Sequence, residues 1–221
     1  MPPVRLYLLR HGQVPSHRGD LSITPEAVQE AFVVGEGFGQ RERGIVEVIS
    51  GETRRAKETA SHLAQGIVAA DGQVIGPAVA LALRNPDLYV AGTRVNMVSS
   101  PEALAAQVDG LSAQDVARLA FFREFLAAPD RIGMWLTHGS PPGEDARSVA
   151  TRVRSFAASM VDSIPGRPEV VVAVTHSPLL RAVALDFLGR DIGEPPWVTG
   201  LVLSVAEDRT MSLARFGIEN G

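Results

Sequence analysis

Apolar residues along the chain are arranged in two patterns. Some form short continuous runs, and others recur at helical spacing over longer segments. Runs rich in Val, Ile and Leu predict core strands at Val4–Leu9, Ile45–Ser50 and Glu169–Thr175, and a weaker strand at Ile132–Thr137. Val198–Ala206 and Met211–Phe216 predict a closing hairpin. Because the strands alternate with helical segments, the pattern predicts a three-layer α/β/α sandwich with a mostly parallel central sheet.

The helical stripes have recognisable beginnings and ends. Thr24 followed by Pro25 predicts an N-cap and the first residue of a helix. Apolar residues at helical spacing predict further helices within 53–67, 149–161 and 180–188, the last ending at Gly189. The stretch 66–76 is predicted to be a loop on the far side of the sheet.

The segment 85–130 has a different pattern. It has no strong strand signal and is interrupted by Pro86, Gly92, Pro101, Gly110 and Pro129. Two short pieces, near 101–108 and 113–127, predict helices. We therefore expect one domain over residues 1–221, with 85–130 as a helical cap inserted over the edge of the sheet.

Composition narrows the possible functions. The chain has 221 residues, of which 45% are hydrophobic and 21% charged, as in a globular protein with a sizeable core. A net charge of −4 argues against a broad nucleic-acid surface. The absence of cysteine excludes disulfides, thiolate catalysis and zinc–thiolate sites. No segment has the length of a membrane span or a signal peptide, so a cytoplasmic protein without a membrane partner is expected.

Three predicted strands are each followed by Arg or His. The first is followed by Arg10 and His11, the second by a helix whose first turn carries Arg55, and the third by His176. Ligands of open α/β sheets bind at the carboxyl ends of the strands. Guanidinium groups suit phosphate oxygens, and a neutral imidazole can attack phosphorus. The three strand ends are therefore predicted to converge on one phosphate.

Four motifs, taken in order, carry a resemblance to a known family. They are Arg10-His11-Gly12, Ser50-Gly51-Glu52-Thr53-Arg54-Arg55-Ala56, Gly143-Glu144 and Thr175-His176-Ser177. Together they resemble the histidine phosphatase superfamily, which has the phosphoglycerate-mutase-like fold, over about residues 4 to 188. One such motif is weakly specific, whereas four in the right order are strong.

The resemblance implies a metal-independent phosphatase that hydrolyses a small phosphorylated metabolite and needs no cofactor. His11 would attack phosphorus and become a phosphohistidine, and Arg10, Arg55 and His176 would neutralise the phosphoryl oxygens. The family's general acid is a Glu in the segment that here reads Leu83-Arg84-Asn85-Pro86-Asp87, where Asp87 is the nearest plausible carboxylate.

Substrate contacts are also expected at Gly12, His17 and Ser177. Val14, His17 and Gly51 depart from the residues that are frequent in the family, so some neutral donors to phosphate would be lost. The five histidines show no spacing typical of a metal site.

Several alternatives remain open. His138 also ends an apolar run and rivals His176, and Asp87 could equally be a turn residue after Pro86. The activity could be that of a phosphoglycerate-type mutase, although a chain that ends soon after its last hairpin favours hydrolysis. A regulatory module that binds phosphate without turnover is the other alternative. The sequence is compatible with a monomer or a homodimer.

Overall fold

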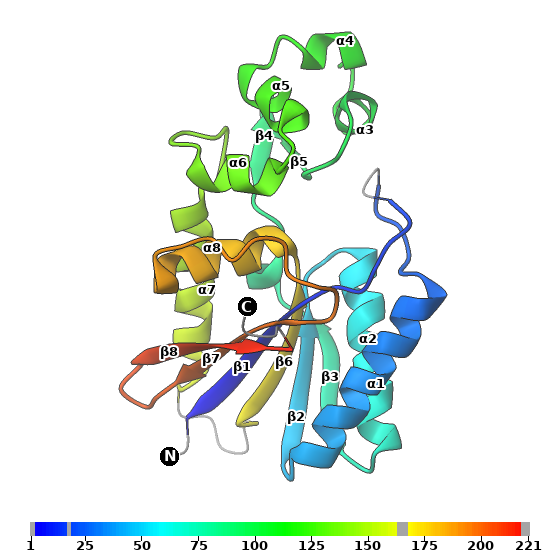
Figure 1. Ribbon diagram of the computed structural model, residues 1–221, viewed down its shortest axis with the longest axis vertical. Helices are drawn as coiled ribbons and strands as arrows, with labels where there is room; N and C mark the ends of the chain where they lie inside the picture. The colour runs from blue at the N-terminus through cyan, green and yellow to red at the C-terminus, as the bar shows by residue number, and fades with distance from the viewer. Residues whose placement is uncertain (1–2, 17–18, 163–167, 218–221) are drawn as a thin grey trace.

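A six-stranded sheet forms the centre of the computed structural model, which describes residues 3–16, 19–162 and 168–217 (Figure 1). The strands lie in the order β3-β2-β6-β1-β7-β8. They are β1 (Val4–Arg10), β2 (Ile45–Ser50), β3 (Gln73–Val79), β6 (Val170–Thr175), β7 (Gly200–Val205) and β8 (Met211–Phe216). The first four in spatial order run parallel, and β7 pairs antiparallel with both β1 and β8. The predicted mostly parallel sheet and closing hairpin are confirmed.

Helices cover both faces of the sheet. One face carries α1 (Pro25–Arg41) and α2 (Arg54–Ala69), and the other carries α7 (Ala146–Ser159) and α8 (Ser177–Leu188) (Figure 1). Side chains of β1 alternate between the two layers, as the pleat of a strand requires. Tyr7 and Leu9 pack in the core below α1 and α2, whereas Leu6 and Leu8 pack in the core of the opposite face. The predicted three-layer arrangement is confirmed.

α1 and α2 approach each other so closely that glycines lie at their contact. A Cβ atom on Gly35 would lie 2.2 Å from the backbone oxygen of Leu63. One on Gly66 would lie 2.0 Å from the backbone oxygen of Phe32. Neither position has room for any side chain, so the two helix backbones are in direct contact.

A group of short elements lies apart from the sheet, in green at the top of Figure 1. It comprises β4 (Leu88–Val90), β5 (Thr93–Val95), α3 (Pro101–Ala105), α4 (Ala113–Val116), α5 (Ala120–Ala127) and α6 (Arg131–Thr137). We call residues 88–137 the cap segment. Its interior includes Leu104, Val116, Phe121 and Phe125, all of them buried. These short elements occupy the region in which the sequence predicts a cap, and they continue beyond residue 130 through α6.

The predicted strand at Ile132–Thr137 is wrong, because these residues form α6. Asp130 caps this helix by accepting a hydrogen bond from the Gly133 N–H at 2.9 Å, and one side of the helix buries Trp135 and Leu136. A run of six or seven apolar residues does not by itself distinguish a strand from two helical turns.

The predicted loop at 66–76 is also wrong. α2 continues to Ala69, and β3 begins at Gln73 on the exposed edge of the sheet. Most of the β3 side chains are exposed, so the strand lacks the apolar run that marks the buried strands. A single helical turn, η1 (Leu81–Leu83), then leads towards the cap segment.

Candidate active site

The structure brings Arg10, His11, Arg55 and His176 together at the carboxyl ends of β1 and β6. Arg10 pairs in register with Thr175, so the residues that follow on each strand, His11 and His176, are neighbours. Their ring centroids lie 5.2 Å apart, and both side chains are buried.

Arg55 is the second residue of α2. The hydroxyl of Thr53 caps this helix by accepting from the Ala56 N–H at 3.4 Å. The first turn of α2 thus directs a buried guanidinium towards His11. The opening of a helix adds a partial positive potential to that charge.

The hydrogen bonds of His11 assign its protons. Arg55 Nε lies 3.2 Å from Nε2 of His11, and a guanidinium can only donate. The carbonyl oxygen of Gly12 lies 2.8 Å from Nδ1 and can only accept. These two contacts fit a neutral His11 with its proton on Nδ1 and a lone pair on Nε2. That lone pair is the one an attacking nitrogen needs.

Arg10 is held from three sides. Nη1 donates to the carbonyl oxygen of Pro195 at 2.6 Å, and Nη2 lies 2.6 Å from Oε1 of Glu194. The guanidinium carbon lies 3.3 Å from the centroid of the Trp197 ring. Burial, partly offset by Glu194, lowers the pKa of Arg10 to about 10, so the group stays cationic near neutral pH. Its Nε atom is buried and has no hydrogen-bond partner among the described residues.

Burial also lowers the pKa of Arg55, although the nearby Asp20 carboxylate opposes the change. Asp20 Oδ1 lies 3.4 Å from Nη1 of Arg55 and is itself more than half exposed. Two desolvated guanidinium groups thus flank the neutral imidazole. Such groups interact more strongly with an incoming anion than exposed ones do, since water screens them less.

A cavity of about 370 Å³ opens beside these side chains. Arg10, His11 and Arg55 line it from the sheet side, together with Ser177 at the start of α8. The cap segment supplies the opposite wall, in which the apolar side chains of Met97, Val98, Phe125, Pro129 and Ile132 lie beside the polar side chains of Ser99, Asp130 and Arg131. The geometry therefore offers a cationic floor that suits a phosphoryl group and a partly apolar wall for the rest of a ligand.

Arg181 on α8 is a site residue that the sequence did not single out. Its side chain is 1% exposed and lines the same cavity. It lies 2.6 Å from Asp130 of the cap segment, and it also pairs with Asp191 and Glu194. An arginine amid the apolar residues of α8 was the available signal, because a buried cation needs partners.

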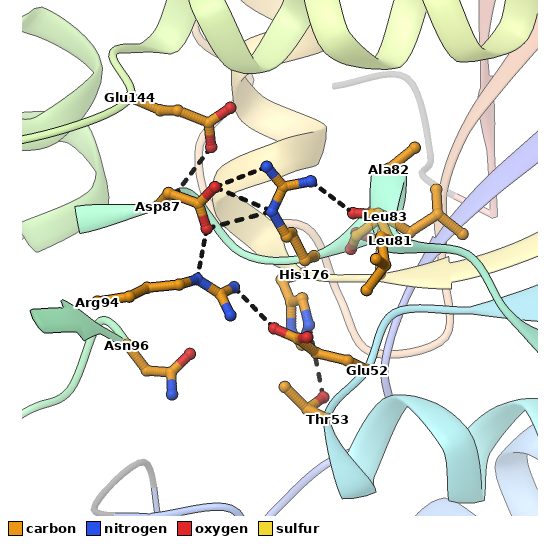
Figure 2. A network of polar contacts seen from close by, with 12 residues as sticks. Glu52, Thr53, Leu81, Ala82, Leu83, Asp87, Arg94, Asn96, Glu144 and His176 are labelled. Atoms are coloured by element: carbon orange, nitrogen blue, oxygen red, sulfur yellow. Dashed lines mark hydrogen bonds and ion pairs between the residues drawn. The ribbon is translucent and has the colours of Figure 1, made fainter. Parts of the chain in front are cut away.

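Asp87, the predicted general acid, lies in a different network (Figure 2). Arg84 donates to both of its carboxylate oxygens, Arg94 donates to Oδ1, and its own N–H donates to Glu144 at 2.8 Å. Burial alone would raise the pKa of Asp87, but the hydrogen bonds and charges of Arg84 and Arg94 outweigh it and hold the pKa below its usual value. The lining of the cavity includes Asn85 rather than Asp87. The acid role of Asp87 stays a prediction, and these contacts weigh against it.

The remaining predicted residues have varied positions. The N–H of Gly12 donates to Thr59 Oγ1 at 2.9 Å, and Ser177 Oγ donates to Glu194 at 2.5 Å. His17 lies outside the described residues. His138 lies in the cap region, where its ring contacts Phe121 edge-on at 5.0 Å. The structure thus places His176 beside His11, and His138 elsewhere.

Sequence reasoning gave no site role to Glu194 or Trp197, although both contact Arg10. The Pro195-Pro196 pair that separates them was visible in the sequence.

No grouping of three or more His, Asp or Glu side chains that could hold a metal ion occurs within residues 3–16, 19–162 and 168–217. Over the same residues, no helix is long and apolar enough to cross a membrane.

Residues 109–207, fewer than half of the chain, match the family model of the histidine phosphatase superfamily (branch 1), as the resemblance predicts. Of the four motifs, the match includes Gly143-Glu144 and Thr175-His176-Ser177. A search of curated proteins found no match.

Solved structures with the same fold include enzymes of two kinds. A mycobacterial glucosyl-3-phosphoglycerate phosphatase is 22% identical, with a TM-score of 0.60 over 98% of this chain and 100% of that one. A phosphoglycerate mutase from Bacillus anthracis is 16% identical, with a TM-score of 0.59 over 98% and 93%. A phosphoserine phosphatase from Entamoeba histolytica, in complex with phosphoserine, is 13% identical, with a TM-score of 0.57 over 96% of each chain. At these identities the likeness establishes the fold.

Proposed function

We propose that this protein is a phosphatase that hydrolyses a small phosphorylated compound through a phosphohistidine on His11. The observation that carries the proposal is the pair of hydrogen bonds to the His11 ring, from Arg55 to Nε2 and from Nδ1 to the carbonyl of Gly12. They give Nε2 a lone pair, which accepts from Arg55 in the absence of substrate, at the floor of a cavity that two buried arginines make electropositive.

The proposed reaction has two steps. In the first, the Nε2 lone pair of His11 forms the N–P bond while the P–O bond to the leaving group breaks, and its electron pair stays on the leaving oxygen. In the second, water attacks phosphorus, the electron pair of the N–P bond returns to Nε2, and orthophosphate leaves with both protons of the water. Arg10, Arg55 and His176 would stabilise the charge on the non-bridging oxygens in both steps. The arginines supply the positive charge that a metal ion supplies in other phosphoryl-transfer enzymes, so the reaction would be metal-independent.

The test uses 4-nitrophenyl phosphate and compares the wild type with His11→Ala and His62→Ala. His62 is the matched control, because it is a histidine on α2 that does not line the cavity and whose Nδ1 lies 3.1 Å from Oε1 of Gln65. We expect turnover by the wild type and by His62→Ala in the presence of a chelator, and a loss of at least about 10³-fold in His11→Ala. Rapid quenching should trap a phosphoryl group that is labile in acid and stable in alkali.

Other outcomes select the alternatives. Equal inertness of the wild type and His11→Ala, with phosphate esters still binding, would favour a regulatory module without turnover. Return of the phosphoryl group to the substrate as an isomer, with little free phosphate, would favour a mutase. Activity that survives in His11→Ala would refute the phosphohistidine.

A further inference from the structure

The carboxylates around the site share one property, which is an arginine partner. On the cavity side, Asp130 lies 2.6 Å from Arg181, and Glu194 lies 2.6 Å from Arg10 and 3.6 Å from Arg181. The hydrogen bonds from Arg181 are the main reason that the pKa of Asp130 falls to about 2. A carboxylate bound in this way is ionised at neutral pH and has no proton to give.

A neighbouring hollow of about 510 Å³ shares Arg55 with the cavity, and Asp20 and Glu52 line it. Both carboxylates are again paired. Asp20 lies 3.4 Å from Arg55, and Glu52 lies 2.7 Å from Arg94. Arg94 also binds Asp87, so the predicted general acid belongs to the same network as Glu52 (Figure 2).

The group that faces the cavity from this part of the chain is an amide. Asn85 is 4% exposed and lines the cavity, two residues before Asp87. An amide can hold a leaving group in place by hydrogen bonding, but it has no proton to release at neutral pH. Around the cavity and the adjoining hollow, each carboxylate of the described residues thus lies within ion-pair distance of an arginine. None occupies the dry, arginine-free setting that keeps a carboxylic acid protonated.

We propose that this site acts on phosphoryl compounds whose leaving oxygen departs as a stable anion without taking a proton. Acyl phosphates, phosphoanhydrides and phosphates of acidic phenols share this chemistry, whereas phosphate esters of ordinary alcohols do not. The first step then balances without an acid, because His11 forms the N–P bond and the P–O electron pair remains on the leaving group as its anion. This inference rests on the proposed phosphatase activity and narrows its substrate class.

The test compares two substrates of nearly equal size, 4-nitrophenyl phosphate and 4-nitrobenzyl phosphate. The first releases a phenolate, and the second must release an alkoxide unless an acid protonates it. The measured quantity is kcat/KM, because it covers the steps up to formation of the phosphoenzyme and excludes its hydrolysis. We expect a preference for the phenyl ester of about 10²–10⁴-fold, the factor that a positioned general acid would otherwise remove. Acetyl phosphate and pyrophosphate are tested as well, and their kcat/KM values distinguish acyl phosphates from phosphoanhydrides as the preferred substrates.

The second part of the test replaces each carboxylate by its amide, as Asp20→Asn, Glu52→Gln, Asp87→Asn, Asp130→Asn and Glu194→Gln. The readout is the ratio of the two kcat/KM values within one variant, so partial loss of folded protein cancels. We expect this ratio to stay within about threefold of the wild type in all five variants.

The results separate the two proposals. A wild-type ratio below about tenfold would overturn the inference and leave the phosphatase intact. One variant that loses benzyl ester hydrolysis selectively would overturn it too, and would identify the acid. Inertness of the wild type towards every phosphate tested would refute the phosphatase, and the inference would fall with it.

Discussion

The sheet with its four covering helices and the cap segment share one apolar core, yet the two parts are built differently. The sheet body buries continuous valine-rich strands, and β6 is buried along its whole length. The cap segment is built from short elements, and it meets the body partly through charged pairs such as Arg181–Asp130 and Arg94–Glu52. Apolar packing thus fixes the phosphoryl site in the body, whereas ion pairs help to hold the wall that faces the rest of a substrate.

This comparison predicts that substitutions in the body change the chemical step most strongly. In Arg55→Ala, a buried cation beside His11 disappears, and we expect kcat to fall by about 10²–10³-fold with a small change in thermal stability. Steady-state kinetics on 4-nitrophenyl phosphate measure the effect.

The neighbouring Arg54→Ala is the matched control for this change. Arg54 is largely exposed and pairs with Glu58 four residues away, so its loss should alter kcat less than threefold. Equal losses in the two variants would mean that disturbance of α2, rather than charge at the site, explains the result.

The next largest effect is expected where the body meets the cap segment. Arg181→Met replaces a buried cation by an apolar side chain of similar length, and it leaves Asp130, Asp191 and Glu194 without this partner. These carboxylates are one third exposed or more and can regain water, so we expect a loss of only about 1–3 kcal/mol in the free energy of unfolding.

Urea unfolding measures this loss, and KM should rise because the wall of the cavity is less well held. Arg154→Met, which removes an exposed pair with Asp186 on the same face, should cost less than about 0.5 kcal/mol. If Arg181→Met unfolds like the control, the cap segment does not depend on this junction.

The smallest predicted effect is a change of folding stability with pH. The pKa of Asp130 is about 2 in the folded protein, against 3.8 for the ordinary carboxyl group, so its ion pair favours the folded state above about pH 4. That contribution is lost as the pH falls towards 2, because the carboxylate becomes protonated in the folded state as well.

Asp130→Asn keeps the cap of α6, because asparagine also accepts at an N-cap, and removes only the charge. We expect the wild type to exceed the variant by less than about 1 kcal/mol near pH 6, since the carboxylate is half exposed. Urea unfolding at a series of pH values should show this difference shrink below pH 4. If the difference in the free energy of unfolding does not change with pH, packing rather than the charge of Asp130 causes it.

The body could be predicted from the sequence because its signals are local. Each buried strand is a compact apolar run, and Arg10, His11 and His176 directly follow such runs. The β3 strand was missed because its exposed edge position removes that signal. Ile132–Thr137 was misassigned because six residues are too few for periodicity to separate helix from strand.

The arginine partners of the carboxylates could not be predicted for a different reason. Arg94 reaches back to Glu52, and Arg181 reaches back to Asp130, across separations of 42 and 51 residues. No pattern along the chain specifies which of many arginines meets which carboxylate. Asp87 therefore read as an available acid in the sequence, although its two arginines occupy it in the structure.

The glycine contact between α1 and α2 has a consequence for catalysis at a distance. Arg55 lies about three helical turns from Gly66 along α2. The distance between the axes of α1 and α2 therefore affects how closely the Arg55 guanidinium approaches His11. We expect an alanine at Gly35 or Gly66 to force the helices apart and draw Arg55 away from the imidazole, although no residue that lines the cavity is replaced. The alignment of the reacting groups thus depends on two places where the chain carries no side chain at all.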